Sequence, residues 1–207
     1  MAAEEINGQA DAAGLAALIS RASAENSDKK RGLAPVERWN PPFCGDIDME
    51  IRADGTWFYM GTPIGRPALV QLFSTVLRKD EDEKTYLVTP VEKVGIRVVD
   101  APFVAVEMSV TEREGRQVLT FRTNVGDVVE AGGEHRLRFA IAGENAELKP
   151  YLHVRGRLEA LVSRPVMYEL VALGETLDVE GQAMFAICSA GAVFPVMPAD
   201  ELDVLSR

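Results

Sequence analysis

The segment 47–60 places the strongest constraint on the fold, because it has the pattern of a β-hairpin. Ile47, Met49 and Ile51 alternate with charged residues, and this period of two is typical of a half-buried strand. The dipeptide Asp54-Gly55, which favours a tight turn, comes next and is followed by Trp57-Phe58-Tyr59. The chain is therefore expected to form antiparallel β-structure from the segment 39–51 onward.

The register of this hairpin follows if Asp54 and Gly55 form a two-residue turn. Arg52 then pairs with Trp57, and Glu50 pairs with Tyr59. This register puts the two aromatic rings on the charged face of the hairpin and leaves the apolar residues for the core. Large exposed aromatics in a group are usually covered, so we expect the other half of the chain, a partner or a ligand over them.

A helix is predicted from Pro67, because proline suits the first helical position and an apolar stripe with helical spacing follows. The stripe consists of Leu69, Leu72, Phe73, Val76 and Leu77. The second half repeats this order, with an aromatic strand at 150–154, a helix across 157–163 and strands at 166–173, 182–188 and 192–196. Gly65-Arg66 aligns with Gly156-Arg157, which indicates an internal duplication.

These elements divide the chain into three parts. Residues 1–36 are predicted to form an N-terminal appendage and linker, with a short amphipathic helix around Leu15, Leu18 and Ile19. Residues 37–124 form the first α+β domain, and residues 125–207 form the second, with a turn at 143–145.

Composition and charge exclude several classes of function. The net charge of -10 repels phosphate backbones and anionic lipids, so neither nucleic acid nor a membrane is an expected partner. We find no secretory leader and no apolar run long enough to span a bilayer, and we expect a cytoplasmic protein. The two cysteines, Cys44 and Cys188, are far apart in sequence and indicate neither a disulfide framework nor a zinc site.

The sequence contains none of the common catalytic or phosphate-binding motifs, which favours a role other than catalysis. The acidic run 80–83 lacks the glycine and the distal glutamate of a calcium loop. No motif indicates a metal or an organic cofactor, so the cofactor stays unknown. Hydrolysis of a phosphate ester through Asp48 or Glu92 is kept as an alternative.

The two Gly-Arg pairs are the best candidates for ligand binding. A helix N-terminus presents unpaired N–H groups, and an adjacent arginine matches a phosphate or a carboxylate. Arg66 and Arg157 at a seam between the halves would suit a ligand with a flat ring and an anionic group. Structural explanations stay open: Trp57 and Tyr59 pack between the halves, Arg66 pairs with Asp48 or Glu50, and His153 is a hydrogen-bonded strand residue.

The block from Trp39 to Phe103 resembles a proteobacterial family of unknown function, DUF1285. The resemblance rests on GDIDMEIRADGTWFYMGTPIGRPALVQLFSTVL, TYLVTPVEKVGI and DAPF. It implies an α+β fold of two related, mostly antiparallel β halves, each with a short helix, the second half resembling a pleckstrin-homology barrel. It also implies a site between the halves for a nucleotide-like ligand and a place in signal transduction. The matching positions are Trp57, Tyr59, Arg66, Glu92, Lys93, Tyr151, His153, Arg155 and Arg157.

The expected function is therefore binding of a small anionic or nucleotide-like ligand in the cleft between the two halves. The candidate ligand contacts are those positions together with Gly65. The alternative is a protein-interaction or self-association module that uses the face of Trp57 and Tyr59 without a small ligand. The oligomeric state stays undetermined.

Overall fold

A computed structural model describes residues 34–142 and 147–201 of the chain. The predicted amphipathic helix around Leu15 and the turn at 143–145 lie outside the described residues, as does most of the predicted appendage. The chain divides into two compact units. Among the described residues, 34–50 and 57–97 belong to the first unit, and 51–56, 98–142 and 147–201 belong to the second.

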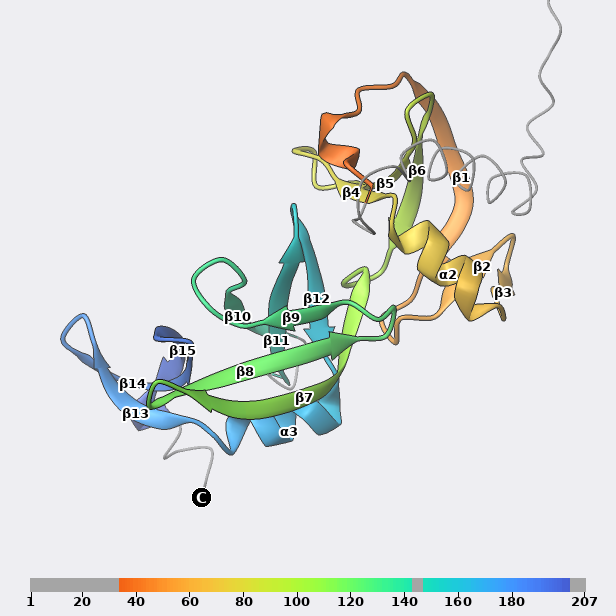
Figure 1. Cartoon of the computed structure of the whole chain (residues 1–207). Helices are drawn as coiled ribbons and strands as arrows, with labels where there is room; N and C mark the ends of the chain where they lie inside the picture. Colours follow the sequence, from red (N-terminus) through yellow and green to blue (C-terminus); the bar gives the residue numbers. More distant parts are fainter. Residues whose placement is uncertain (1–33, 143–146, 202–207) are drawn as a thin grey trace, which may run out of the picture. The chain divides into compact units, whose positions relative to one another are not determined.

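The described residues of the first unit form one six-stranded sheet, one α-helix and one short 3₁₀ turn (Figure 1). In chain order its elements are η1 (Val36–Arg38), β1 (Phe43–Ile51), β2 (Trp57–Tyr59), β3 (Thr62–Pro63), α2 (Pro67–Ser74), β4 (Leu77–Lys79), β5 (Thr85–Val88) and β6 (Lys93–Val98). Met49, Trp57, Phe73 and Leu87 are among the fully buried side chains of this unit. The predicted helix begins at Pro67 as expected, but it ends at Ser74, and the last residue of the predicted stripe, Leu77, begins β4.

Within residues 98–142 and 147–201, the second unit forms a six-stranded sheet, a three-stranded sheet and one helix. Its elements are β7 (Phe103–Arg113), β8 (Arg116–Thr123), β9 (Val128–Glu130), β10 (Leu137–Ala142), β11 (Glu147–Arg155), β12 (Leu158–Val162), α3 (Arg164–Val171), β13 (Glu175–Val179), β14 (Gln182–Ser189) and β15 (Ala192–Pro198). Helix α3 packs against β7 (Figure 1), while β14 contacts β8 and β15 contacts β10.

The two six-stranded sheets have the same topology. The first runs β3-β2-β1-β6-β5-β4, and the second runs β9-β8-β7-β12-β11-β10. Each sheet therefore consists of two three-stranded meanders, which meet at its centre where the strand that comes first in the sequence pairs with the strand that comes last. β7 and β12 are parallel, and the hydrogen bonds from Lys93 N to Pro42 O and from Val99 N to Ile51 O give β1 and β6 the same direction. The predicted duplicated α+β architecture is therefore confirmed. The likeness to a pleckstrin-homology barrel stays a prediction, because neither six-stranded sheet closes on itself among the described strands.

The residue alignment that led to the duplication was wrong in the second half. The predicted helix across 157–163 is strand β12, because Leu158, Ala160 and Val162 are buried with a period of two. The predicted strand at 166–173 is largely helix α3, which has a proline in its first turn and buries Val166 and Leu170 four residues apart. Gly156-Arg157 therefore forms the β11–β12 turn, and only Gly65-Arg66 precedes a helix.

The main boundary between the units lies at residue 98, whereas the predicted domains 37–124 and 125–207 meet at residue 125. The physical reason is the pairing of β7 with both β8 and β12, which brings residues 103–123 into the sheet of the second unit. A boundary at 125 would cut that sheet.

The hairpin at 43–60 forms, but its register differs from the predicted one by one residue. Gly55 N donates to Arg52 O at 2.9 Å and Arg52 N donates to Thr56 O at 3.0 Å, which defines a three-residue turn. Gly55 has φ of 82° and supplies the bulge that such a turn needs. Met60 N then donates to Asp48 O at 2.9 Å. A slip of one residue exchanges the faces of a strand, so Trp57 lies on the buried face with Met49.

None of the helices in residues 34–142 and 147–201 is long and apolar enough to cross a membrane.

Candidate functional site

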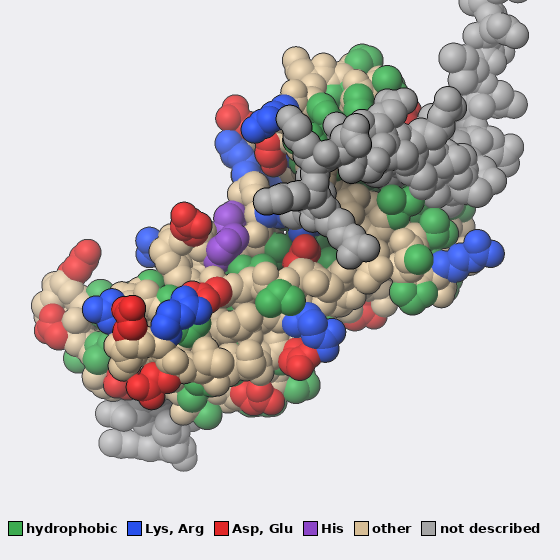
Figure 2. All heavy atoms as spheres, viewed as in Figure 1, with side chains coloured by type: hydrophobic (Ala, Val, Ile, Leu, Met, Phe, Trp, Pro, Cys, Tyr) green, Lys and Arg blue, Asp and Glu red, His purple; other side chains and the backbone are tan. Residues whose placement is uncertain are grey.

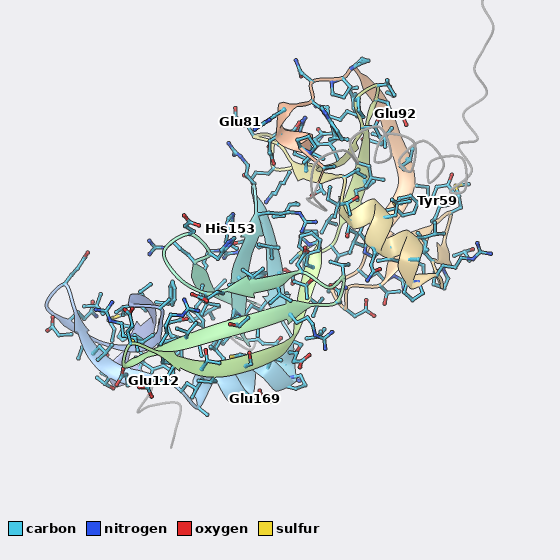
Figure 3. The ribbon with its side chains drawn as sticks, in the orientation of Figure 1. Tyr59, Glu81, Glu92, Glu112, His153 and Glu169 are labelled. Carbon is cyan, nitrogen blue, oxygen red and sulfur yellow. The ribbon has the colours of Figure 1, made fainter. Side chains whose placement is uncertain are left out.

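The predicted ligand residues of the first unit lie in two separate places. Figure 3 labels Tyr59 and Glu92 in different parts of this unit. Near the start of α2, Trp57 is 1% exposed and its ring stacks on Phe73, with centroids 6.2 Å apart. Tyr59 is half-buried, and Gly65 and Arg66 are exposed just before the helix. Trp57 thus has the packing of a core residue, and its indole Nε1 has no hydrogen-bond partner among the described residues.

Glu92 and Lys93 lie beside a charged cluster at the other location. Lys93 Nζ is 3.0 Å from Asp80 Oδ2 and lies 4.5 Å from the centre of the Tyr86 ring. Asp80 also accepts hydrogen bonds from the buried Arg78. Burial acts to raise the pKa of Asp80, but the hydrogen bonds from Arg78 and Lys93 outweigh it and hold the pKa below its ordinary value. The carboxyl oxygen Oε1 of Glu92 is buried and has no partner within the described part of the chain.

The predicted residues of the second unit gather on strand β11. Tyr151, His153 and Arg155 are spaced by two along this strand. The Tyr151 hydroxyl donates to Asp100 Oδ1 at 2.7 Å, and the Arg138 guanidinium lies 4.3 Å from the centre of its ring. Burial and the hydrogen bond to Asp100 raise the pKa of Tyr151 to about 12. These contacts use the single donor of the hydroxyl and place a cation over the ring.

The other two residues on β11 also have partners within the second unit. His153 stacks on His135 with ring centroids 5.5 Å apart, and Figure 2 shows the two histidines as one purple patch. The two ring nitrogens of His153 lie 3.1 Å from the carbonyl oxygen of Glu134 and 2.8 Å from that of Gly156. Arg155 Nη1 is 2.6 Å from Asp127 Oδ2. Arg157 is exposed in the β11–β12 turn.

A cavity of about 350 Å³ lies in the second unit, in a place that the sequence did not indicate. It is formed where the start of β8 meets the start of β13 and the β14–β15 hairpin. Its polar lining comes from Arg116, Gln117, Glu175, Cys188 and Ser189, and its apolar lining from Leu173, Ala192 and Val193. These residues come from segments about 60 residues apart, so no local motif marks them.

Two of the polar side chains in the cavity wall form hydrogen bonds with main-chain groups. Gln117 Nε2 donates to Cys188 O at 2.8 Å. Ser189 Oγ accepts from Leu119 N at 2.9 Å and donates to Ala131 O at 2.7 Å. These hydrogen bonds tie the β14–β15 hairpin to β8, and they make the cavity wall a fixed part of the fold.

The Cys188 thiol and the Arg116 guanidinium in the cavity differ in charge and in their partners. Burial raises the pKa of the Cys188 thiol, and the negative charge of Glu175 and a hydrogen bond to Glu175 raise it further, so the thiol stays protonated. Arg116 has neither a hydrogen-bond partner nor an ion-pair partner among residues 34–142 and 147–201. A Cβ atom on Gly191 would lie 3.1 Å from Arg116 Nη1, so the guanidinium lies directly over this glycine.

Metal binding finds no support in the described part of the chain, where no three or more His, Cys, Asp or Glu side chains form a group suited to an ion.

Comparisons with known proteins agree with this fold. Residues 34–101 match the N-terminal domain of DUF1285, a domain of unknown function, and residues 102–196 match its C-terminal domain. The chain is similar to the crystal structure of a DUF1285 family protein from Silicibacter pomeroyi DSS-3. The two share 52% identity over 90% of this chain and 97% of that chain, with a TM-score of 0.79.

A second solved structure, a DUF1285 family protein from Shewanella baltica OS155, is 26% identical over 60% of this chain and 90% of that chain, with a TM-score of 0.47. A search of curated proteins found no match. The family resemblance predicted from residues 39–103 is confirmed by the two domain matches and by the Silicibacter structure. The chain belongs to the DUF1285 family.

Proposed function

We propose that this protein binds a small anionic ligand in the cavity of its second unit and acts as a sensor of that ligand. The observation that carries the proposal is the Arg116 guanidinium, which lines a cavity of about 350 Å³ without a partner among the described residues. Cavities that bind small molecules have volumes of about 300–1,000 Å³. Anion binding is the chemistry that a planar guanidinium with several donors supports best.

The contact energy suits reversible binding. A bidentate contact between Arg116 and a carboxylate or phosphate supplies two charged hydrogen bonds, each contributing about 1.5–3 kcal/mol. The two bonds together contribute about 3–6 kcal/mol, and the loss of translational and rotational freedom offsets much of this gain, so Arg116 alone gives at most roughly millimolar affinity and the rest of the cavity has to supply the remainder. Weak binding of this kind is reversible, which a sensing role requires.

Binding of a nucleotide-like ligand by the residues predicted from the sequence remains a second proposal. Tyr151, His153 and Arg155 already bond to other groups of the protein, and this gives the cavity the stronger claim. The alternative of a protein-interaction face around Trp57 and Tyr59 is weaker, because Trp57 is 1% exposed and only Tyr59 of this pair reaches the surface.

A thermal-shift screen tests the proposal. The screen would use carboxylates, phosphate esters and nucleotides against the wild type and the Arg116→Gln variant. A ligand at one hundred times its dissociation constant stabilises the bound form by about 2.7 kcal/mol, which is readily measured. We expect at least one compound to stabilise the wild type and not Arg116→Gln. Arg122→Gln is the matched control, since Arg122 is an exposed arginine on the same strand that pairs with Glu107 outside the cavity. Stabilisation that persists in Arg116→Gln, or that is absent for every compound, would refute the proposal.

A further inference from the structure

Two opposite charges line the same cavity without pairing to each other. Arg116 comes from the start of β8, and Glu175 is the first residue of β13. No ion pair joins these two described side chains, and none of the other described residues forms an ion pair with either. Both charges therefore face the cavity without an ion-pair partner in the part of the chain that the structure describes.

The backbone fixes both positions. In the β13–β14 ladder Glu175 lies opposite Ala186, and Cys188 follows two residues further along β14. Besides burial, the nearby charge of Glu175 raises the pKa of the Cys188 thiol, which places the carboxylate beside Cys188 with acceptor lone pairs left for a ligand. Across the cavity, the β7–β8 pairing sets Arg116 opposite Arg113, and the Arg116 guanidinium lies over Gly191 of the β14–β15 turn.

We propose that the cavity selects a zwitterion of amino-acid type, with its anionic group on Arg116 and its ammonium group on Glu175. This inference rests on the proposed function and specifies its ligand. A zwitterion neutralises both unpaired charges at once, whereas a simple anion pairs with Arg116 and is repelled by Glu175. Leu173 and Val193 line the same cavity and give an apolar surface for an aliphatic side chain. The chain's net charge of -10 adds to the repulsion of an anion that carries no ammonium group.

The test is calorimetric titration of the full chain with the twenty standard amino acids and phosphoethanolamine. For each amino acid that binds, the N-acetylated analogue removes the ammonium charge and the amide analogue removes the carboxylate charge; for phosphoethanolamine only the N-acetylated analogue is used. We expect a binder among these zwitterions, with both analogues at least 10-fold weaker. In Glu175→Gln the penalty for N-acetylation should disappear, and in Arg116→Gln the penalty for amidation should disappear.

Control variants separate the cavity from general electrostatics. Arg122→Gln and Glu169→Gln make the same charge changes outside the cavity, and Figure 3 labels Glu169 on α3. We expect both variants to bind like the wild type. Arg116 and Glu175 are exposed, so we expect their variants to fold, and far-UV circular dichroism checks this.

The outcomes distinguish the two proposals. If simple anions bind as tightly as zwitterions and need Arg116, the zwitterion inference fails and the proposed function stands. If no member of the zwitterion panel binds, the inference also fails, and the separate anion screen then decides the proposed function. If nothing binds in an Arg116-dependent way in either experiment, both proposals fail.

Discussion

The hairpin turn at Gly55 gives the sharpest stability prediction, because both its backbone conformation and its close neighbours require a glycine. Gly55 has φ of 82°, a conformation that a side chain disfavours. A Cβ atom added there would also lie 2.6 Å from Asn124 Nδ2 and 2.9 Å from Val104 Cγ2. Asn124 cannot move freely, since its Oδ1 accepts from Val104 N at 3.0 Å and its Nδ2 donates to Gly55 O at 3.3 Å.

The cost of Gly55→Ala has two parts. The left-handed backbone conformation costs about 1–2 kcal/mol for a residue with a Cβ atom. Displacing Asn124 leaves the N–H of Val104 unpaired in a residue that is 7% exposed, which costs about a further 1–3 kcal/mol. We therefore expect Gly55→Ala to lower the free energy of unfolding by about 2–5 kcal/mol.

Urea unfolding followed by far-UV circular dichroism measures this loss. Gly115→Ala is the matched control, because Gly115 has φ of 73° in the β7–β8 turn and a Cβ atom there would meet no atom within 4 Å. The control should lose only the conformational part, about 1–2 kcal/mol. In an Asn124→Ala background the extra cost of Gly55→Ala should shrink, and the part that remains above the control value comes from the contact with Val104 Cγ2. Equal losses for Gly55→Ala and Gly115→Ala in the wild-type background would refute the reasoning.

Three further predictions concern individual side chains. Tyr151→Phe should cost about 1.5–3 kcal/mol near neutral pH, because the hydroxyl donates to the Asp100 carboxylate. The pKa of Tyr151 is raised from 10.0 to about 12, so this stabilisation is fully present below pH 10 and is lost as the pH rises toward 12. The free energies of unfolding of the wild type and Tyr151→Phe, measured across that pH range, should therefore converge. Asp80→Asn should cost about 3 kcal/mol by leaving the buried Arg78 without its carboxylate. Because the pKa of Asp80 is lowered from its ordinary value of 3.8, the stabilisation by Asp80 is fully present above pH 3.8 and is lost as the pH falls further. The difference in the free energy of unfolding between the wild type and Asp80→Asn should therefore shrink in acid, and a difference that does not shrink contradicts this assignment. Trp57→Ala should cost about 3–5 kcal/mol in urea unfolding because the ring is in the core, and a loss below 1 kcal/mol would place it at the surface instead.

Local sequence patterns predicted the elements that depend on neighbouring residues. The alternation before Asp54-Gly55 and the proline at residue 67 correctly predicted β1, β2 and the start of α2. The signal for α3 was also present, as Ser163 and Pro165 before apolar residues at helical spacing. It was outweighed by the β-branched and aromatic residues of the segment, although burial of Val166 and Leu170 against the sheet was enough to form a helix.

Register and side-chain partners needed the tertiary structure. Asp54-Gly55 supports a two-residue or a three-residue turn with similar ease, and Gly55 adopts the bulge because its carbonyl and Cα pack against Asn124, which is 69 residues away. That choice moved Trp57 from the predicted charged face to the core. Sequence could not foresee it, because the deciding contact joins segments from different parts of the chain.

The candidate site follows the same division. The sequence by itself determined that the chain forms two α+β halves, that it carries a strong negative charge and that it belongs to a recognisable family, since these depend on periodicity, composition and local motifs. Only the tertiary structure decided which charged groups are left for a ligand. Tyr151, His153 and Arg155 found partners within the fold, whereas Arg116 and Glu175 line one cavity without an ion pair between them. Pairing of charges depends on distances in space, and such distances are set by the packing of the sheets.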